Sequence, residues 1–266
     1  MAFDGALPEL FCVAGLEVAV FGRELNPGAP VVFVTHGRNG QLANILGNAS
    51  DLAANGFVAV CLEQRNHGRR VIDARLNQGF CRTMAADMYG VTVGTSTDIV
   101  TLMDLLPGRL GISTARCGLT GGSLGGHTTI MAMGMDARIR AAAALIGSGD
   151  FRRLIELRAE YNGCPKPGET FEDYFPGELA EAVRKHDPVL NPERFADRAL
   201  LLANGEDDPL VQIDCARRTH DALAKHYTRP ERLKLSVYPG VGHNIPPAMW
   251  AEAIAWLRRW LIETPI

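Results

Sequence analysis

The stretch Leu119-Thr120-Gly121-Gly122-Ser123-Leu124-Gly125-Gly126 places the pattern GxSxG between an apolar run typical of a buried strand, 116–120, and a helical pattern, 124–135. A serine at such a junction sits on a sharp, strained turn, so its neighbours at 121 and 125 must be small for strand and helix to approach each other. We therefore expect the Ser123 hydroxyl to stand clear of the sheet. The Leu124 N–H, at the positive end of the helix dipole, would face a developing oxyanion.

A serine hydroxyl is a poor nucleophile until a base takes its proton, and the base in turn needs an acid to orient it. His243 lies in a glycine-rich loop that follows an apolar run, and it is our candidate for the base. Asp208 also follows an apolar run and is our candidate for the acid. Asp150 is an alternative acid, since it ends the strand-like run before a long insertion, and Asp207 is a weaker one.

Short apolar runs alternate with longer helical patterns along the chain, which predicts a mostly parallel sheet with helices on both faces. Two β-like stretches that flank Gly15 predict an antiparallel pair at one sheet edge. Further strands are expected at 30–35, 57–62, 116–120, 139–146, 199–203 and 233–238. Helices are expected at 42–54, 95–106, 124–135 and 247–261, the second capped by Thr95 or Ser96 and closed by Pro107-Gly108.

Residues 147–197 contain no buried-strand pattern and carry prolines, paired charges and aromatic side chains. Such a composition suits a helical cap over a pocket. The aromatic residues in question are Phe151, Tyr161, Phe171, Tyr174 and Phe175. We expect residues 1–266 to form one α/β domain with this cap as an insertion.

Several motifs together resemble the α/β-hydrolase superfamily, and within it the dienelactone-hydrolase-like and prolyl-oligopeptidase-like esterases. They are His36-Gly37, Arg65-Asn66-His67-Gly68, the turn at Ser123, the segment 205–211 and Gly242-His243, in the order Ser, Asp, His. The resemblance spans nearly the whole chain. It implies an eight-stranded α/β-hydrolase fold and a Ser123–His243–Asp208 triad.

The same resemblance implies that the residue after the HG pair supplies a second oxyanion N–H, which is Arg38 here, with Asn39 as the alternative. The sequence departs from the motifs of two related groups of enzymes. A strict dienelactone hydrolase carries a cysteine nucleophile where this chain has Ser123. The HGGG signature of lipase-type esterases is replaced by His36-Gly37-Arg38-Asn39-Gly40.

Four arginines, Arg38, Arg65, Arg69 and Arg70, belong to loops at the edge where the pocket should open. Guanidinium groups there could bind a substrate carboxylate, and we take Asn39, Arg65 and Arg69 as candidate substrate-binding residues. The alternative is that these arginines pair with nearby acids such as Glu63 and Asp73.

Three other histidines and the six cysteines receive structural interpretations. His127, on the helix after Ser123, is expected to be buried and hydrogen-bonded, and His36 and His67 are expected to fasten loops. The cysteines show no CxxC pair and no zinc-ligand spacing, so we expect free thiols and no metal.

The composition of the 266 residues, with 47% hydrophobic and 21% charged residues and a formal net charge of -3, is that of an ordinary folded chain and gives no field that would attract nucleic acid. Residues 1–20 show neither a basic leader nor an apolar block, so no membrane anchor is expected and the cytoplasm is the expected compartment. Three tryptophans on the last expected helix are interpreted as packing against the sheet, with a homodimer surface as the alternative. No cofactor is expected.

The sequence thus predicts a serine hydrolase that cleaves a carboxylic ester of a small molecule, a lactone or thioester included, through an acyl-enzyme. One alternative is a small amidase or peptidase of the prolyl-oligopeptidase-like group. Another is a non-catalytic hydrolase-fold receptor that keeps the pocket but has lost turnover.

Overall fold

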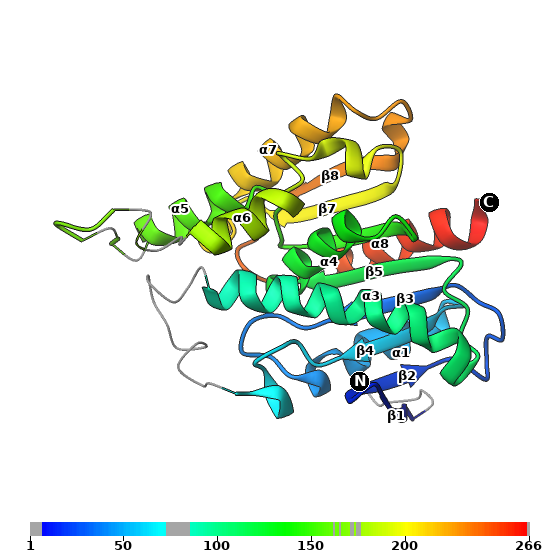
Figure 1. Cartoon of the computed structure of the whole chain (residues 1–266). Coiled ribbons are helices and arrows are strands. Elements are labelled where there is room, and N and C mark those ends of the chain that lie inside the picture. Colours follow the sequence, from blue (N-terminus) through cyan, green and yellow to red (C-terminus); the bar gives the residue numbers. More distant parts are fainter. Residues whose placement is uncertain are drawn as a thin grey trace.

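The computed structural model describes residues 7–72, 86–161, 163–164, 166–170, 173 and 177–264. Their strands form an eight-stranded sheet in the order β1-β2-β4-β3-β5-β6-β7-β8 (Figure 1). The strands are β1 Glu9–Val13, β2 Leu16–Phe21, β3 Val31–Thr35, β4 Val58–Leu62, β5 Cys117–Gly122, β6 Ile139–Leu145, β7 Ala199–Gly205 and β8 Leu233–Tyr238. Strand β2 runs antiparallel to both of its neighbours, and β3 to β8 are parallel. The sheet is therefore mixed but mostly parallel, and the expected antiparallel edge is confirmed.

The central strands are apolar on both faces because helices cover both faces of the sheet. Every residue of β3 and of β4 is buried. Alternate side chains enter two separate cores: Phe33 packs with helices α3 and α4, whereas Val32 and Val34 pack with α1 and α8. These two apolar layers give the arrangement that the apolar runs predict, a mostly parallel sheet with helices on both faces.

Helices lie on both faces of this sheet (Figure 1). The α-helices are α1 Leu46–Ala54, α3 Val91–Leu110, α4 Leu124–Met135, α5 Phe151–Tyr161, α6 Gly177–His186, α7 Ile213–Ala224 and α8 Pro247–Arg258. Short 3-10 helices lie at η1 Leu42–Ile45, η2 Gly68–Arg70, η6 Pro192–Phe195 and η7 Pro230–Arg232, and π-helical turns at η4 Ala86–Gly90 and η8 Arg259–Glu263. No helix among these residues is both long and apolar enough to cross a membrane.

The bounds predicted for α3 are wrong at both ends. Thr95 and Ser96 do not cap the helix, because they lie inside it, fully buried, where Thr95 Oγ1 accepts the Arg65 N–H (3.0 Å) and Ser96 Oγ donates to the Thr128 carbonyl (3.3 Å). The helix also continues through Pro107-Gly108 and ends only at Gly111, whose φ of 68° is left-handed. A proline in the last turn removes one hydrogen bond without preventing helical backbone.

Between β6 and β7, where the cap is expected, the described residues form α5, α6 and η6. Phe151 is fully buried and its ring lies 5.2 Å from that of Tyr89. Phe171, Tyr174 and Phe175, which we expected in the cap, lie outside the described residues, as does the side chain of Tyr161. The helical character of the insertion agrees with the absence of strand patterns in its sequence.

The cysteines and tryptophans only partly follow the expectations from sequence. Cys61, Cys117 and Cys215 are buried free thiols, but Cys164 is disulfide-bonded, which corrects the expectation of free thiols throughout. Linear spacing could not reveal this bond, because a disulfide depends on the distance between two Cα atoms in the fold. Of the tryptophans, Trp256 lies on α8 and is buried in the core between that helix and the sheet. The other two are partly buried against the same core.

Candidate active site

Ser123 occupies a sharp turn between the end of β5 and the start of α4. Its φ of 57° and ψ of -119° are strained for a residue with a side chain. The turn is fastened by the Ser123 N–H, which donates to the Leu145 carbonyl of β6 (2.9 Å). This sharp backbone turn directs Ser123 away from the strand, as the GxSxG pattern predicts.

The glycines on either side of Ser123 are required by close backbone packing rather than by flexibility. A Cβ on Gly125 would lie 2.5 Å from the Thr35 carbonyl oxygen of β3. A Cβ on Gly121 would lie 2.7 Å from the same oxygen. Both distances are shorter than any real carbon–oxygen contact, so strand β3 can approach the turn only because both positions lack a side chain.

The structure brings Ser123, His243 and Asp208 into one hydrogen-bonded chain, although they are far apart in the sequence. The Nε2 atom of His243 lies 2.9 Å from Ser123 Oγ, and its Nδ1 atom lies 2.7 Å from Asp208 Oδ2. This network assigns the proton of the neutral imidazole to Nδ1, which donates to the carboxylate and leaves Nε2 to accept the serine hydroxyl. The geometry is that of a base poised to deprotonate the serine.

Asp208 is held in place by the loop that follows β7. Its side chain is fully buried, and its second oxygen, Oδ1, accepts the N–H groups of Leu210 (2.8 Å) and Val211 (3.0 Å). The Asp207 N–H donates to the Val241 carbonyl (3.0 Å), which joins this loop to the loop that carries His243. The acid and the imidazole are therefore positioned by the same pair of loops.

The alternative acids have other partners. Asp150 Oδ2 accepts a hydrogen bond from Arg218 Nε (2.6 Å), and its Oδ1 accepts the Arg153 N–H in the first turn of α5 (3.1 Å). The side chain of Asp207 is exposed. Among the acids considered from the sequence, Asp208 is the one that reaches the imidazole.

The residues expected to bind an oxyanion lie next to Ser123. Leu124 is the first residue of α4, where backbone N–H groups have no acceptor within the helix. On the other side, a Cβ built on Gly37 would lie 3.6 Å from Ser123 Cβ, so the loop that continues into Arg38 runs against the serine. Both Leu124 and Arg38 line the cavity onto which Ser123 opens.

This cavity, which we call the Ser123 cavity, has a volume of about 330 Å³. Its lining residues are Arg38, Asn39, Met88, Ser123, Leu124, His127, Arg158, Leu210, Val211 and His243. Four of them, Met88, Arg158, Leu210 and Val211, were not anticipated from the sequence. Leu210 and Val211 could have been found, because they lie two and three residues after Asp208, whereas nothing in the sequence marks Met88 or Arg158.

Two of the three candidate substrate-binding residues lie outside the Ser123 cavity. Asn39 lines it, with a left-handed φ of 59°. Arg65 instead forms a bidentate pair with Asp98, at 3.0 and 2.7 Å, and the exposed Arg69 lies 3.0 Å from Glu17. Arg70 also binds Asp98 (2.7 Å). The loop arginines other than Arg38 are therefore engaged with acids, which is the alternative that the sequence left open.

Three further histidines, His36, His67 and His127, are hydrogen-bonded to backbone groups. His36 Nδ1 donates to the Gly37 carbonyl (2.8 Å) and its Nε2 accepts the Gln64 N–H (3.1 Å), while His67 Nδ1 donates to the Arg65 carbonyl (2.8 Å). His127 is buried, with Nδ1 2.9 Å from the Ser148 carbonyl, and burial lowers the pKa of His127 to about 4. The expectations for these three residues are confirmed.

A family model described as the prolyl oligopeptidase family matches residues 82–264. The chain belongs to the prolyl oligopeptidase family. It is accordingly a serine hydrolase of the α/β-hydrolase type. The matched region contains Ser123, His243 and Asp208, the three residues that are joined by hydrogen bonds.

Two relatives that align with this chain over nearly their whole length are named as esterases. It is 27% identical over 256 residues to the Bacillus subtilis (strain 168) protein named "Putative esterase YitV", covering 94% of this chain and 97% of that one. It is 26% identical to esterase YjfP of Escherichia coli (strain K12), covering 95% of this chain and 97% of that one. Among solved structures, TT1662 from Thermus thermophilus aligns with a TM-score of 0.73 and 26% identity over 96% of this chain and 98% of that one.

Proposed function

We propose that this chain hydrolyses a carboxylic ester of a small molecule through an acyl-enzyme on Ser123. The observation that carries the proposal is the pair of hydrogen bonds at His243, 2.9 Å to Ser123 Oγ and 2.7 Å to Asp208 Oδ2. A serine bonded to an imidazole that is itself bonded to a buried carboxylate is the arrangement that activates a hydroxyl for attack on a carbonyl.

In the first half of the reaction, Ser123 Oγ attacks the ester carbonyl carbon and its proton passes to His243 Nε2. Asp208 accepts the Nδ1–H and balances the imidazolium charge. The backbone N–H groups of Leu124 and Arg38 stabilise the negative oxygen of the tetrahedral intermediate. When the intermediate collapses, the alcohol leaves with the proton from Nε2 and the acyl group stays on Ser123.

In the second half, a water molecule loses a proton to Nε2 and attacks the acyl carbonyl. The same N–H groups stabilise the second tetrahedral intermediate, and its collapse returns the proton to Ser123 and releases the acid. Each turnover therefore consumes one ester and one water and leaves the protein unchanged.

The Ser123 cavity supports a small substrate rather than a polymer. Its volume of about 330 Å³ lies at the low end of the range for small-molecule pockets. The apolar side chains of Met88, Leu210 and Val211 line it together with polar groups, so it has room and apolar contact for a short acyl chain. Relatives named as esterases support an ester over an amide as the scissile bond.

The direct test is Ser123→Ala, assayed with a short-chain p-nitrophenyl ester. We expect kcat to fall on the order of 10⁴-fold or more, because the nucleophile is lost while the fold is retained. Ser113→Ala is the matched control, since Ser113 is an exposed serine on the loop before β5, and it should keep full activity. Near-normal turnover by Ser123→Ala would refute the proposal.

A fluorophosphonate probe separates an esterase from a non-catalytic receptor, because only an activated serine reacts with it. We expect a single adduct, on Ser123, that is lost in the His243→Ala variant. Matched p-nitrophenyl ester and p-nitroanilide substrates with the same acyl group then compare ester with amide cleavage. A higher kcat/KM for the anilide would assign the chain to the peptidases of its family instead.

A further inference from the structure

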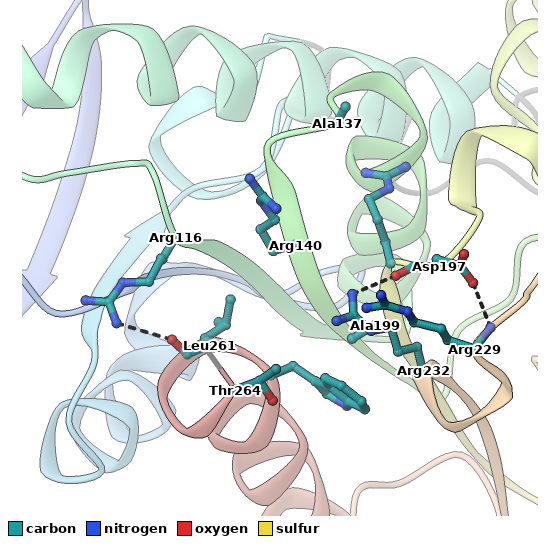
Figure 2. Close-up of a pocket in the computed structure, with 11 residues that line it drawn as sticks. Arg116, Ala137, Arg140, Asp197, Ala199, Arg229, Arg232, Leu261 and Thr264 are labelled. Atoms are coloured by element: carbon teal, nitrogen blue, oxygen red, sulfur yellow. Dashed lines mark hydrogen bonds between the residues drawn. The ribbon is translucent and has the colours of Figure 1, made fainter. Parts of the chain in front are cut away.

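A second cavity, which we call the arginine cavity, lies at the opposite end of the strands from Ser123. Its volume is about 320 Å³, and it is lined by residues near the N-terminal ends of β5, β6, β7 and β8 and by residues in and just after the C-terminal turn η8 (Figure 2). Arg116 precedes β5 and Ser123 follows it, so the length of that strand, roughly 20 Å, separates the two cavities. The arginine cavity is therefore separate from the site of the proposed ester chemistry.

The lining of the arginine cavity is strongly positive. It contains five arginines and one carboxylate, that of Asp197. The charged residues of this lining are Arg116, Arg140, Arg198, Arg229, Arg232 and Asp197. Because guanidinium groups stay charged at any physiological pH, this lining carries a surplus of positive charge.

The one carboxylate of this lining, that of Asp197, faces the charge of Arg229 but accepts its hydrogen bonds from two backbone N–H groups and a hydroxyl. Asp197 Oδ1 accepts the N–H groups of Thr228 (2.8 Å) and Arg229 (2.9 Å), and Oδ2 accepts the Thr228 hydroxyl (2.6 Å). These bonds, of which the one from the Thr228 hydroxyl contributes most, lower the pKa of Asp197. These bonds fasten the turn before β8, and Figure 2 draws the one from the Arg229 N–H.

Three of the arginines are fixed in place by neutral carbonyl oxygens. Arg116 donates to the carbonyls of Gly28 (2.8 Å) and Leu261 (3.4 Å). Arg198 donates to the carbonyls of Asp136 (2.9 Å) and Ile139 (3.2 Å). Arg232 donates to that of Asp197 (2.9 Å). Carbonyl partners orient a guanidinium group without cancelling its charge, so these side chains form a rigid positive wall.

Arg140, from β6, and Arg229, from the turn before β8, are exposed at the cavity. Within the described part of the chain, neither guanidinium group takes part in a hydrogen bond or an ion pair. Two rigid elements thus present positive side chains that have no acceptor of their own in this part of the structure.

Two side chains of the lining each contain a buried N–H donor. Trp260 Nε1 and Arg232 Nε are buried, and neither has an acceptor among the described residues. Arg232 also lies over the Trp260 ring, 5.0 Å from its centroid, which holds the two side chains together. Buried N–H groups in folded proteins almost always have an acceptor, so two such donors beside one cavity are unusual.

We propose that the arginine cavity binds a small oxyanion that carries at least two negative charges, of the phosphate or the carboxylate type. The rigid guanidinium groups at the strand ends hold its oxygens, and the exposed pair Arg140 and Arg229 closes on it. A planar guanidinium matches both phosphate and carboxylate geometry, so the two ligand types share this chemistry.

The test uses inorganic pyrophosphate and citrate as probes in isothermal titration calorimetry, each against sodium chloride at matched ionic strength. We expect saturable one-to-one binding of at least one probe to the full chain. The tighter of the two identifies the ligand type. Arg140→Gln and Arg229→Gln should each weaken binding about tenfold, because each removes a charged donor from the anion.

Arg109→Gln is the matched control, since Arg109 is an exposed arginine on α3 that does not line the arginine cavity, and it should leave the dissociation constant unchanged. The three substituted side chains are exposed, so unchanged melting temperatures without ligand verify folding. The absence of saturable binding of both probes, or equal weakening by Arg109→Gln, would overturn the proposal. Neither result depends on the fate of the ester chemistry, because Ser123 is assayed separately.

Discussion

Asp207 and Asp208 are adjacent carboxylates with opposite environments. Asp208 is buried against His243 and accepts two backbone N–H groups, whereas the side chain of Asp207 is exposed. The difference arises from the backbone, because the Asp207 N–H is bonded to the Val241 carbonyl and so turns the next residue toward the imidazole. One peptide unit thus decides which carboxylate can orient the base.

This contrast gives a prediction for the proposed triad. Asp208→Asn should lower kcat on the order of 10³-fold or more, because an amide cannot take the Nδ1–H of His243 and also stabilise an imidazolium. Asp207→Asn removes the neighbouring charge and should leave kcat within about twofold of the parent, as is usual for an exposed group. Steady-state kinetics on one p-nitrophenyl ester compare the two variants. Equal activities would show that Asp208 is not the orienting acid.

At the scale of elements, helix α3 shows how a proline can be accommodated within a helix. Pro107 lacks an N–H, so the Met103 carbonyl one turn earlier loses its helical partner. The Thr114 hydroxyl, beyond the end of the helix, donates to that carbonyl instead (3.0 Å). Gly111 then ends the helix with its N–H bonded to the Pro107 carbonyl (3.2 Å).

Thr114→Val should therefore destabilise the chain by about 1–2 kcal/mol, because it leaves a buried carbonyl without a donor while keeping the side-chain shape. Thr97→Val is the matched control. The Thr97 hydroxyl also bonds to a helical carbonyl, that of Val93 (2.9 Å), but it is exposed to water, and the expected change is within about 0.5 kcal/mol. Urea unfolding measures both values. A loss at Thr97 as large as that at Thr114 would contradict this account of the helix end.

The sequence predicts the elements of the sheet and the reactive turn well, for a physical reason. Strands such as β3 and β4 are covered on both faces, so their positions appear directly as short apolar runs. The start of α3 was missed because Thr95 and Ser96 look like caps in the sequence but serve contacts with other elements. Whether Arg65 faces the pocket or Asp98 likewise depends on which helix packs beside its loop, and local sequence does not carry that information.

Across the molecule, the parallel strands β3 to β8 separate the two proposed sites. Strands β3 to β8 all run in the same direction, so the loops that carry Ser123, Asp208 and His243 meet at the C-terminal ends of the strands. The arginine cavity lies at their N-terminal ends. Substitutions at one end of the strands should therefore leave binding at the other end unchanged, unless the sheet itself is perturbed.

The stability of the whole fold combines two buried ionisable groups with opposite pH dependence. Burial lowers the pKa of His127 to about 4, below its ordinary value of about 6.5. Burial raises the pKa of Asp187 to about 7, although its carboxylate accepts the N–H groups of Phe151 (2.9 Å) and Val189 (2.8 Å), which favour the charged form. Between pH 4 and 6.5 the unfolded state binds more protons at His127, and the folded state binds more at Asp187.

As the pH falls from 7 to 5, His127 should therefore lower the free energy of unfolding by about 2 kcal/mol, and Asp187 should raise it by a similar amount. His127→Gln removes the first contribution, so acidification from pH 7 to 5 should lower its free energy of unfolding less, or raise it more, than it does in the native chain. Urea titrations of both proteins at pH 7, 6 and 5 measure the difference. Parallel profiles would mean that His127 titrates alike in the folded and unfolded chain, and that its burial against Ser148 does not exclude the proton.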